Sequence, residues 1–355
     1  MRLSDGRQVV APMQGRPPDW PPRGDEPMTP AEIRKARAAN HRARARDFAD
    51  SHGLAEAALV AAFTGKGVVA VEAGPERLLP PVRQLGESLA LTRNASAVQE
   101  RERRYGPLAP LGEGWTLTGD GIELQIDPRH WVHAFAVTEE TAKGAKRSIQ
   151  VFDAAGEAVH KIHLTATSDV AAFGRLIEEL RLAKQSDTLP LVPAGPAAPS
   201  GSPADAGLTQ LWDESPSPEA LGPRLAAAGI SPPDVLKELG APRARPLRPV
   251  AMTELLERAA AGGVPLEIRG GNPGCLQIFR GRVERILPAG YWINVMDPGY
   301  NLHLRTDHLA SVFLTDRGPA GGLTVEAYDA AGSLILAVTG EAGWDQVAQG
   351  LSAVP

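Results

Sequence analysis

The sequence predicts an α+β fold in which a run of antiparallel strands closed by a helix occurs twice. Three observations support this: a tetrapeptide that is repeated, blocks of residues that recur at a constant shift, and alternating apolar patterns separated by short turns. Alternation with short turns is typical of antiparallel strands, because a tight hairpin can join them.

The repeat is the strongest internal signal. The tetrapeptide Asp-Ala-Ala-Gly stands at 153–156 and again at 329–332, after an apolar run in each case. Three further blocks recur at a shift of 178 residues: Arg93-Asn94 on Gly271-Asn272, 124–126 (Leu-Gln-Ile) on 302–304 (Leu-His-Leu), and 130–135 on 308–313. The shift falls to 176 at the tetrapeptide, so two residues are lost in the preceding loop. Closing helices are predicted at Asp169–Leu182 and Ala342–Leu351, and duplication is the interpretation we adopt.

Helices are predicted before each run of strands. Thr29-Pro30-Ala31-Glu32 has a threonine cap, proline at the first helical position and glutamate three residues after the cap, and we expect this helix to reach about Ser51. A second short helix is predicted at Ala55–Phe63. A helical segment at Ser217–Leu239 is expected to break at Ser231-Pro232-Pro233, where a new helix can start.

Proline- and glycine-rich stretches suggest where the domains begin and end. Residues 1–28 are predicted to be a disordered arm, and residues 191–208 a Pro/Ala/Gly linker. The first repeat is then expected at 29–190 and the second at 209–355.

Composition excludes some classes of protein. The net charge of -5 and pI near 6.0 argue against broad nucleic-acid binding, despite a basic stretch at 34–46. Cys275 is the only cysteine, so an internal disulfide is impossible and a cysteine metal site is not expected. The N-terminal residues do not resemble a targeting signal, and no apolar run is long enough to span a bilayer, which predicts a cytoplasmic protein without membrane insertion.

The histidines are the residues most open to a chemical role. His130 and His133 flank Trp131 and precede Phe135, and imidazole near aromatic rings suits a flat ligand such as heme. The commoner alternative is a strand whose aromatic side chains pack the sheet. His160 and His163 lie on a predicted strand that would point their rings to opposite faces, and we expect them to be surface or edge residues.

Several blocks resemble the hemin-degrading (HemS/ChuS-like) heme-trafficking family. In the first half they are Leu85-Gly86-Glu87, Leu91-Thr92-Arg93-Asn94, 130–137 and 147–153; in the second half they are 271–279, 292–295 and 300–304. The resemblance covers about residues 40–352. It implies an α+β fold of two tandem repeats, each a large antiparallel sheet with flanking helices, and a heme cleft between sheet and helices in the second half. It also implies a cytoplasmic protein that handles heme.

The family's site residues are largely replaced in this chain. The resemblance places Glu219 at the position of the axial histidine and Gln125 at that of an arginine on the opposite side of the heme. Gln99 stands where the family has a further histidine. Arg317 is retained as a basic residue suited to a heme propionate. A polar glutamine and tyrosine near the last strand are replaced by Ala337 and Thr339.

Three hypotheses follow. The first is a heme-trafficking protein that binds heme or another tetrapyrrole through unrecognised ligands, with His133 and His303 as candidates. The second is an interaction or regulatory protein that keeps the scaffold without heme, with the arm and linker serving a protein partner. The third is an enzyme that cleaves heme oxidatively with an external reductant, and it has the least support in the residues. The sequence leaves both a protein partner and a dimer open.

Overall fold

The computed structural model describes residues 27–119, 121–192 and 207–354. The predicted N-terminal arm and the predicted linker fall almost entirely outside these residues. By their internal contacts the chain forms two compact units. The first comprises Met1–Thr92, Arg101–Ala194 and Asn272–Cys275; the second comprises Arg93–Glu100, Gly195–Gly271 and Leu276–Pro355.

Each repeat has three helices, a strand, a helix, eight strands and a closing helix. The helices of the first repeat are α1 (Pro30–Ala39), α2 (Ala45–Ser51), α3 (Glu56–Ala61), α4 (Pro75–Val82) and α5 (Val170–Leu180). Its strands are β1 (Val68–Val71), β2 (Glu87–Arg93), β3 (Ala97–Arg104), β4 (Leu108–Leu111), β5 (Gly114–Leu117), β6 (Glu123–Ile126), β7 (His133–Thr141), β8 (Gly144–Phe152) and β9 (Ala158–Leu164).

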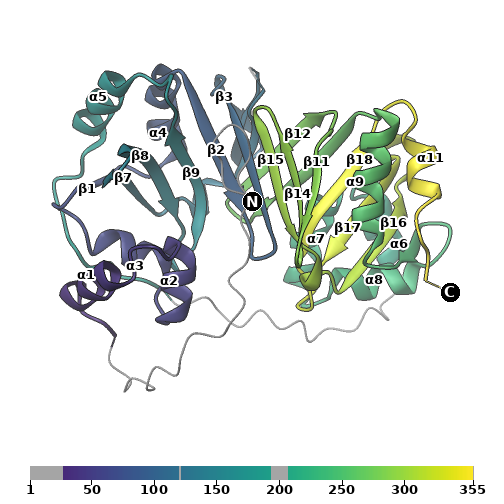
Figure 1. The fold of residues 1–355 in the computed structure, drawn as a ribbon. Coiled ribbons are helices and arrows are strands. Elements are labelled where there is room, and N and C mark those ends of the chain that lie inside the picture. Colours follow the sequence, from purple (N-terminus) through teal and green to yellow (C-terminus); the bar gives the residue numbers. More distant parts are fainter. Residues whose placement is uncertain (1–26, 120, 193–206, 355) are drawn as a thin grey trace. The chain divides into compact units, whose positions relative to one another are not determined.

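The second repeat follows the same order, with one short helix added before its last hairpin. Its helices are α6 (Leu208–Asp213), α7 (Pro218–Ala227), α8 (Pro232–Leu239), α9 (Ala251–Gly262), the added α10 (Gly318–Gly321) and α11 (Trp344–Gln349). Its strands are β10 (Ala244–Leu247), β11 (Leu266–Asn272), β12 (Cys275–Gly281), β13 (Ile286–Ala289), β14 (Trp292–Asp297), β15 (Tyr300–Arg305), β16 (Ser311–Asp316), β17 (Leu323–Tyr328) and β18 (Leu334–Gly340). Figure 1 shows both sets of elements.

The sheet order confirms the duplication. In the first unit the strands run β1-β7-β8-β9-β2, and in the second unit their counterparts run β10-β16-β17-β18-β11. Neighbouring strands in both runs are antiparallel. Each unit also contains a three-stranded antiparallel series, β4-β5-β6 or β13-β14-β15. The predicted α+β fold with two repeats of a large antiparallel sheet and flanking helices is therefore confirmed.

The repeated tetrapeptide forms the same turn in both copies. The Asp153 carboxylate accepts hydrogen bonds from the backbone N–H of Ala155 and Glu157, each at 2.9 Å. Asp329 does the same in the second copy, at 2.9 and 2.8 Å. The turn then needs a left-handed residue, and the closing glycines have φ of +86° and +79°. Glycine adopts this conformation without steric cost, which explains why both ends of the tetrapeptide recur.

The N-terminal helix begins as predicted but ends early. Thr29 and Glu32 form a reciprocal capping box at the start of α1. The prediction that this helix continues to about Ser51 is wrong, because the chain leaves the helix after Ala39 and resumes at Ala45. Side chains donate hydrogen bonds to backbone carbonyls in this region. The Asn40 amide donates to Ala36 O at 3.0 Å, and the Arg37 guanidinium donates to Ala43 O at 2.7 Å. Such local bonds compete with the helical ladder.

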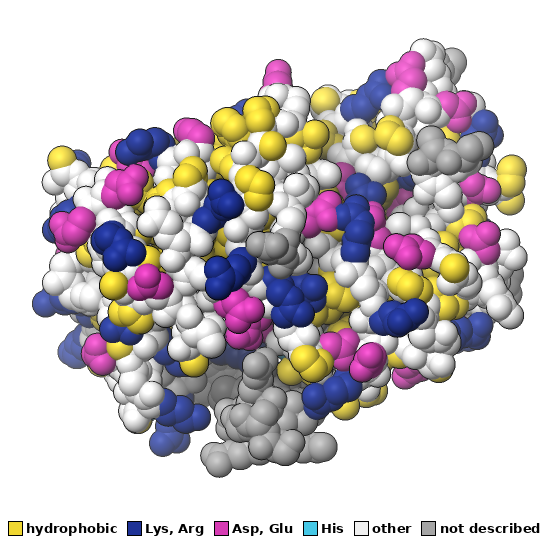
Figure 2. Space-filling model, turned by 90° about the horizontal axis from the view of Figure 1, so that it is seen from above, with side chains coloured by type: hydrophobic (Ala, Val, Ile, Leu, Met, Phe, Trp, Pro, Cys, Tyr) yellow, Lys and Arg dark blue, Asp and Glu magenta, His cyan; other side chains and the backbone are white. Residues whose placement is uncertain are grey.

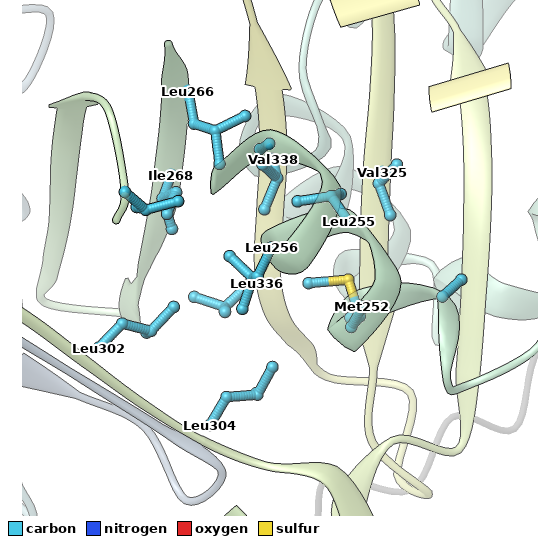
Figure 3. Packing of buried hydrophobic residues seen from close by; sticks show 14 of the residues in the cluster. Met252, Leu255, Leu256, Leu266, Ile268, Leu302, Leu304, Val325, Leu336 and Val338 are labelled. Carbon is cyan, nitrogen blue, oxygen red and sulfur yellow. The ribbon is translucent and has the colours of Figure 1, made fainter. Parts of the chain in front are cut away.

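The core of the second unit lies between its sheet and α9. Figure 3 shows Met252, Leu255 and Leu256 of α9 directed at the sheet, where they meet Leu336 and Val338 of β18. These side chains are almost completely buried. Side chains of α11 complete the same cluster, so α9 and α11 cover one face of this sheet.

The opposite face of that sheet is covered by α6, α7 and α8. Because side chains alternate along a strand, Val312 and Leu314 of β16 belong to the α9 cluster, whereas Phe313 packs with the other three helices. The first unit repeats the arrangement: Ala134 and Ala136 of β7 pack with α4 and α5, and Phe135 packs with α3. In each unit, one face of these strands is thus covered by the helices that precede the strand run and the other face by the helix before the second strand and the closing helix.

The surface mixes charges of both signs. On the face drawn in Figure 2, Lys and Arg side chains are interspersed with Asp and Glu and with apolar side chains. Within the described residues, no helix is long and apolar enough to cross a membrane.

Candidate functional site

The candidate site is one face of the strands β10-β16-β17-β18-β11 in the second unit, the face that α6 and α7 cover. Strands β16 and β17 place Phe313, Thr315, Glu326 and Tyr328 on this face, and all four are at most 2% exposed. A buried carboxylate among aromatic rings is costly unless it is paired, so the partners of Glu326 define the site.

Glu326 pairs with Arg317 in a buried network. The Arg317 guanidinium donates to Glu326 Oε1 at 2.8 Å, and their side chains are only 2% and 0% exposed. The same carboxylate accepts hydrogen bonds from the hydroxyls of Thr315, at 2.7 Å, and Tyr328. Burial and the neighbouring Glu326 charge raise the pKa of Tyr328 well above its ordinary value, which keeps its phenol a proton donor.

Arg317 also binds α6 and the loop after it to the sheet. Its guanidinium donates to Ser215 O, in the loop between α6 and α7, at 2.9 Å. It stacks over Trp212 of α6 at 4.0 Å from the ring centroid. Cation–π contact with a buried ring adds to the ion pair. This one side chain, directly after β16, therefore links β17, α6 and the loop between α6 and α7.

Glu219 forms the second link between α7 and the sheet. It is the second residue of α7, after the Ser217 cap, and its Oε2 lies 2.6 Å from Nη2 of Arg269 on β11. The carboxylate is buried, and the Ser217 side chain and the backbone of Glu219 itself bond to it as well. Burial raises the pKa of Glu219, and the Arg269 charge opposes that rise. Arg269 also lies 3.7 Å from Glu267 Oε1.

A small residue separates the two networks. In the sheet register, Ala337 of β18 pairs with Arg269 on one side and with Glu326 on the other. The predicted loss of polar groups at Ala337 and Thr339 therefore falls within this face. Thr339 uses its hydroxyl to donate to Leu323 O at 3.0 Å.

The structure brings together two of the five predicted site residues. Glu219 and Arg317 lie on the same face of the second unit. Arg317 is enclosed by Glu326 and Trp212, so a heme propionate would have to displace these partners, and its propionate role stays a prediction. His303 lies on β15, where its Nδ1 is 2.7 Å from Asn294 Oδ1. Gln125 lies on β6 and His133 opens β7, both in the first unit.

His133 and Gln99 have contrasting surroundings. His133 is half-buried, its Nε2 has no hydrogen-bond partner, and burial lowers its pKa, against the raising effect of Asp153. Gln99, where the family would have a histidine, is fully engaged. Its amide donates to Gly270 O and Gln277 O at 3.1 and 3.0 Å, and its carbonyl accepts from the Tyr300 hydroxyl at 2.9 Å. Gln99 therefore has a structural role in the second unit.

The first unit contains a buried polar network that the sequence did not indicate. His160 of β9 is 1% exposed and lies between Tyr105, at 2.7 Å from Nε2, and Thr92, at 2.8 Å from Nδ1. Cys275 Sγ lies 3.8 Å from Nδ1, and Trp131 stacks on the ring at 6.1 Å. The expectation that His160 is a surface or edge residue is wrong, because β9 lies between β8 and β2 inside the sheet. Burial lowers the pKa of His160 to about 3 and raises that of the Cys275 thiol to about 12.

The His160 network predicts acid sensitivity. The pKa of His160 is lowered from 6.5 to about 3 in the folded chain, so between these values the unfolded chain binds the extra proton. The free energy of unfolding should therefore fall on acidification by up to about 1.4 kcal/mol per pH unit from this group. In chemical unfolding at stepwise pH, His160→Gln should flatten that slope, whereas His41→Gln, at an exposed histidine, should leave it unchanged. Equal slopes in the wild type and His160→Gln would contradict this.

Comparison with known proteins places the repeats in a sequence family. The family described as haemin-degrading HemS.ChuX domain matches residues 53–180 and again residues 229–349. The hemin transport protein HmuS of Yersinia pestis is 29% identical over 301 residues, which cover 84% of this chain and 87% of HmuS. HemS of Yersinia enterocolitica is 28% identical over 311 residues, covering 86% and 90%.

Solved structures agree with the fold over nearly the whole chain. The crystal structure of holo-PhuS, a heme-binding protein from Pseudomonas aeruginosa, matches with a TM-score of 0.85 and 32% identity, covering 92% of this chain and all of PhuS. The heme-degrading enzyme ChuS from Escherichia coli O157:H7 matches with a TM-score of 0.80 and 22% identity, covering 91% of this chain. At that identity, ChuS supports the fold alone.

Proposed function

Because this chain belongs to the haemin-degrading HemS.ChuX family, we propose that it binds heme, or a closely related tetrapyrrole, and passes it on during heme and iron uptake in the cytoplasm. The observation that carries this proposal is the similarity to the heme-binding protein PhuS, which extends over 92% of this chain at 32% identity. A likeness that includes both repeats and their preceding helices supports a shared ligand better than a match of one domain would.

We place the ligand on the face of the second sheet under α6 and α7. This face offers aromatic side chains for a flat ring, in Trp212, Phe313 and Tyr328, and guanidinium groups for carboxylates, in Arg269 and Arg317. Because these groups are buried against one another, a tetrapyrrole can reach them only if α6 and α7 move away from the sheet. Glu219, on the first turn of α7, then faces the ligand.

Transport fits this face better than oxidative cleavage does. The second unit contains His303 and His308, and both use Nδ1 elsewhere: His303 with Asn294 at 2.7 Å and His308 with Ser96 at 3.0 Å. Among the described residues, neither imidazole belongs to the set of side chains that packs under α6 and α7. Enzymes that activate oxygen at heme depend on a strong axial donor, which a carboxylate replaces poorly.

A second candidate function is supported by the ion pairs themselves. Glu219–Arg269 and Arg317–Glu326 hold α6 and α7 against the sheet with every charge paired. A face closed in this way would suit a protein that has kept the scaffold for interaction or regulation without heme.

A heme titration distinguishes the two candidates. We expect added hemin to give a saturable change in the Soret band at one heme per chain. His133→Ala and His303→Ala should each leave the titration unchanged if the ligand lies under α7. A linear, non-saturating response would favour the heme-independent function, and loss of binding in either histidine variant would move the site away from α7.

A further inference from the structure

We infer that the two units open and unfold as one cooperative system, because each unit is completed by the end of a hairpin from the other. The two hairpins are β2–β3 and β11–β12, which occupy equivalent places in the repeats. Residues Asn272–Cys275 belong to the first unit and Arg93–Glu100 to the second, whereas the flanking residues of each hairpin belong to the other unit. The coupling needs no ligand, so it is independent of the proposed function.

The first unit encloses the end of the β11–β12 hairpin. The Asn272 amide donates to Val159 O at 2.9 Å. Gly274 O accepts a hydrogen bond from the indole N–H of Trp131, also at 2.9 Å. Cys275 is 1% exposed and packs in the apolar cluster of this unit. The hairpin end is therefore a part of the first unit's core.

The second unit encloses the end of the β2–β3 hairpin in the same way. The Asn94 amide donates to Ile335 O at 2.9 Å. Ser96 O accepts a hydrogen bond from the backbone N–H of Arg305 at 2.8 Å. Ala97 is 3% exposed and packs in the α9 cluster. Each unit thus depends on residues that the other half of the sequence supplies.

The two hairpin ends make matching bonds at repeat-equivalent positions. The bond from Arg305 N to Ser96 O has its counterpart in a bond from the backbone N–H of Asp127 to Gly274 O, at 3.2 Å. Because both copies keep the pattern, the exchange is a property of the repeat and not of a single hairpin. The equivalent pairs, at shifts of 178 or 176 residues, are Asn94 and Asn272, Ser96 and Gly274, Asp127 and Arg305, and Val159 and Ile335.

Unfolding of either unit removes a part of the other. If β11 and β12 lose their places in the second unit, the residues Asn272–Cys275 are no longer held, and the first unit loses buried hydrogen bonds and apolar packing. Loss of the first unit has the same effect on the second through Arg93–Glu100. Since coupling of this kind is reciprocal, whatever stabilises one unit also stabilises the other.

Gly274 is a position at which the coupling can be perturbed. A Cβ added there would lie 2.7 Å from His130 Cβ and 2.7 Å from Val159 Cγ1, so Gly274→Ser cannot fit without displacing the first unit's side chains. The equivalent residue Ser96 does have room, and its hydroxyl lies 3.0 Å from a histidine nitrogen. Gly174→Ser, in α5 of the first unit, is the matched control, because no atom lies within 4 Å of a Cβ added there.

The single cysteine provides the readout for the first unit. Cys275 is the only cysteine of the chain and is 1% exposed, so a thiol reagent such as DTNB reaches it only when the hairpin end leaves its place. Its labelling rate is measured in the full chain at stepwise low denaturant. We expect Glu326→Ala, in the core of the second unit, to raise this rate at least about tenfold. Asp234→Ala, at an exposed position of α8, should leave it unchanged.

Hydrogen exchange followed by mass spectrometry provides the readout for the second unit. Gly274→Ser should raise the exchange rate of amides in β16 and β17 at least about tenfold, and Gly174→Ser should not change it. In the wild type, the denaturant dependence of Cys275 labelling should equal that of the slowest amides in β16 and β17, because both then report the same opening.

Independent opening of the units would overturn the coupling. Cys275 labelling that does not respond to Glu326→Ala would show it, as would exchange in β16 and β17 that does not respond to a folded Gly274→Ser variant. So would a wild type in which Cys275 is labelled without denaturant dependence while β16 and β17 stay protected, since the hairpin end is then released locally. The wild-type comparison decides the question even if a variant does not fold.

Discussion

Replacing Glu326 with alanine should lower the free energy of unfolding by about 3–5 kcal/mol, because it leaves the Arg317 guanidinium charged and buried without its counter-ion. Both side chains are almost fully enclosed, at 2% and 0% exposure. The hydroxyls of Thr315 and Tyr328 lose their acceptor at the same time. Chemical unfolding followed by circular dichroism measures the loss.

A matched ion pair on the surface provides the control. Asp234 and Lys237 lie 3.1 Å apart on α8, at 51% and 61% exposure, and Asp234→Ala should cost less than about 1 kcal/mol. Removing both charges in the double variant Arg317→Met, Glu326→Leu should recover much of the lost stability, since no buried charge then stays unpaired. If Glu326→Ala were as mild as Asp234→Ala, Arg317 would have to reach solvent, and the enclosed face described above would be wrong.

The architecture could be predicted because its signals are local. The Asp-Ala-Ala-Gly turn requires an acceptor at its first position and a left-handed residue at its last, and both survive in each copy. Register is then fixed by alternation along the strands that flank the turn, because a slip of one residue would exchange the two faces of the sheet. These constraints act over a few neighbouring residues, so they can be recognised in the sequence without knowledge of the fold.

The contents of the site could be predicted only in part. The resemblance placed Glu219 and Arg317, and the structure shows them on one face. Their partners could not be predicted. Arg269 is 50 residues from Glu219 in the sequence. The Arg317–Glu326 ion pair can be recognised only once the Arg317 side chain is known to point into the core and not into solvent. An arginine followed nine residues later by a glutamate was the available signal.

The His160 network illustrates the same limit. Its partners Thr92, Tyr105 and Cys275 come from three separate strands or turns, and the histidine sits in a segment that reads like an edge. Only the pairing order, which puts β9 between β8 and β2, shows that the ring is enclosed. The break after Ala39 was missed for a different reason, because side-chain caps from Arg37 and Asn40 overrode the helical composition of the segment.

Substituting Glu219→His should raise the affinity for heme by at least about tenfold and should let the protein retain ferrous heme. Imidazole is the stronger donor to iron in both oxidation states, whereas carboxylate favours the ferric one. The position suits a histidine, because the ring would stand at the start of α7 beside Arg269, whose charge favours the neutral imidazole that binds iron. Arg269 would still have Glu267 as a neighbour, at 3.7 Å, so its own charge would not be left alone.

The Soret band and its response to reduction provide the measurement. Glu219→His should shift the Soret band of the bound ferric heme toward that of a nitrogen-ligated heme, and the heme should stay bound after reduction with dithionite. Glu214→His, at the exposed position ten residues before Arg224, controls for a histidine merely added to the surface. If Glu219→His folds, binds heme and leaves the spectrum unchanged, the iron does not lie beneath α7. His133 or His303 would then be the residue to test, because His133 Nε2 is buried without a partner and His303 is held in place by Asn294.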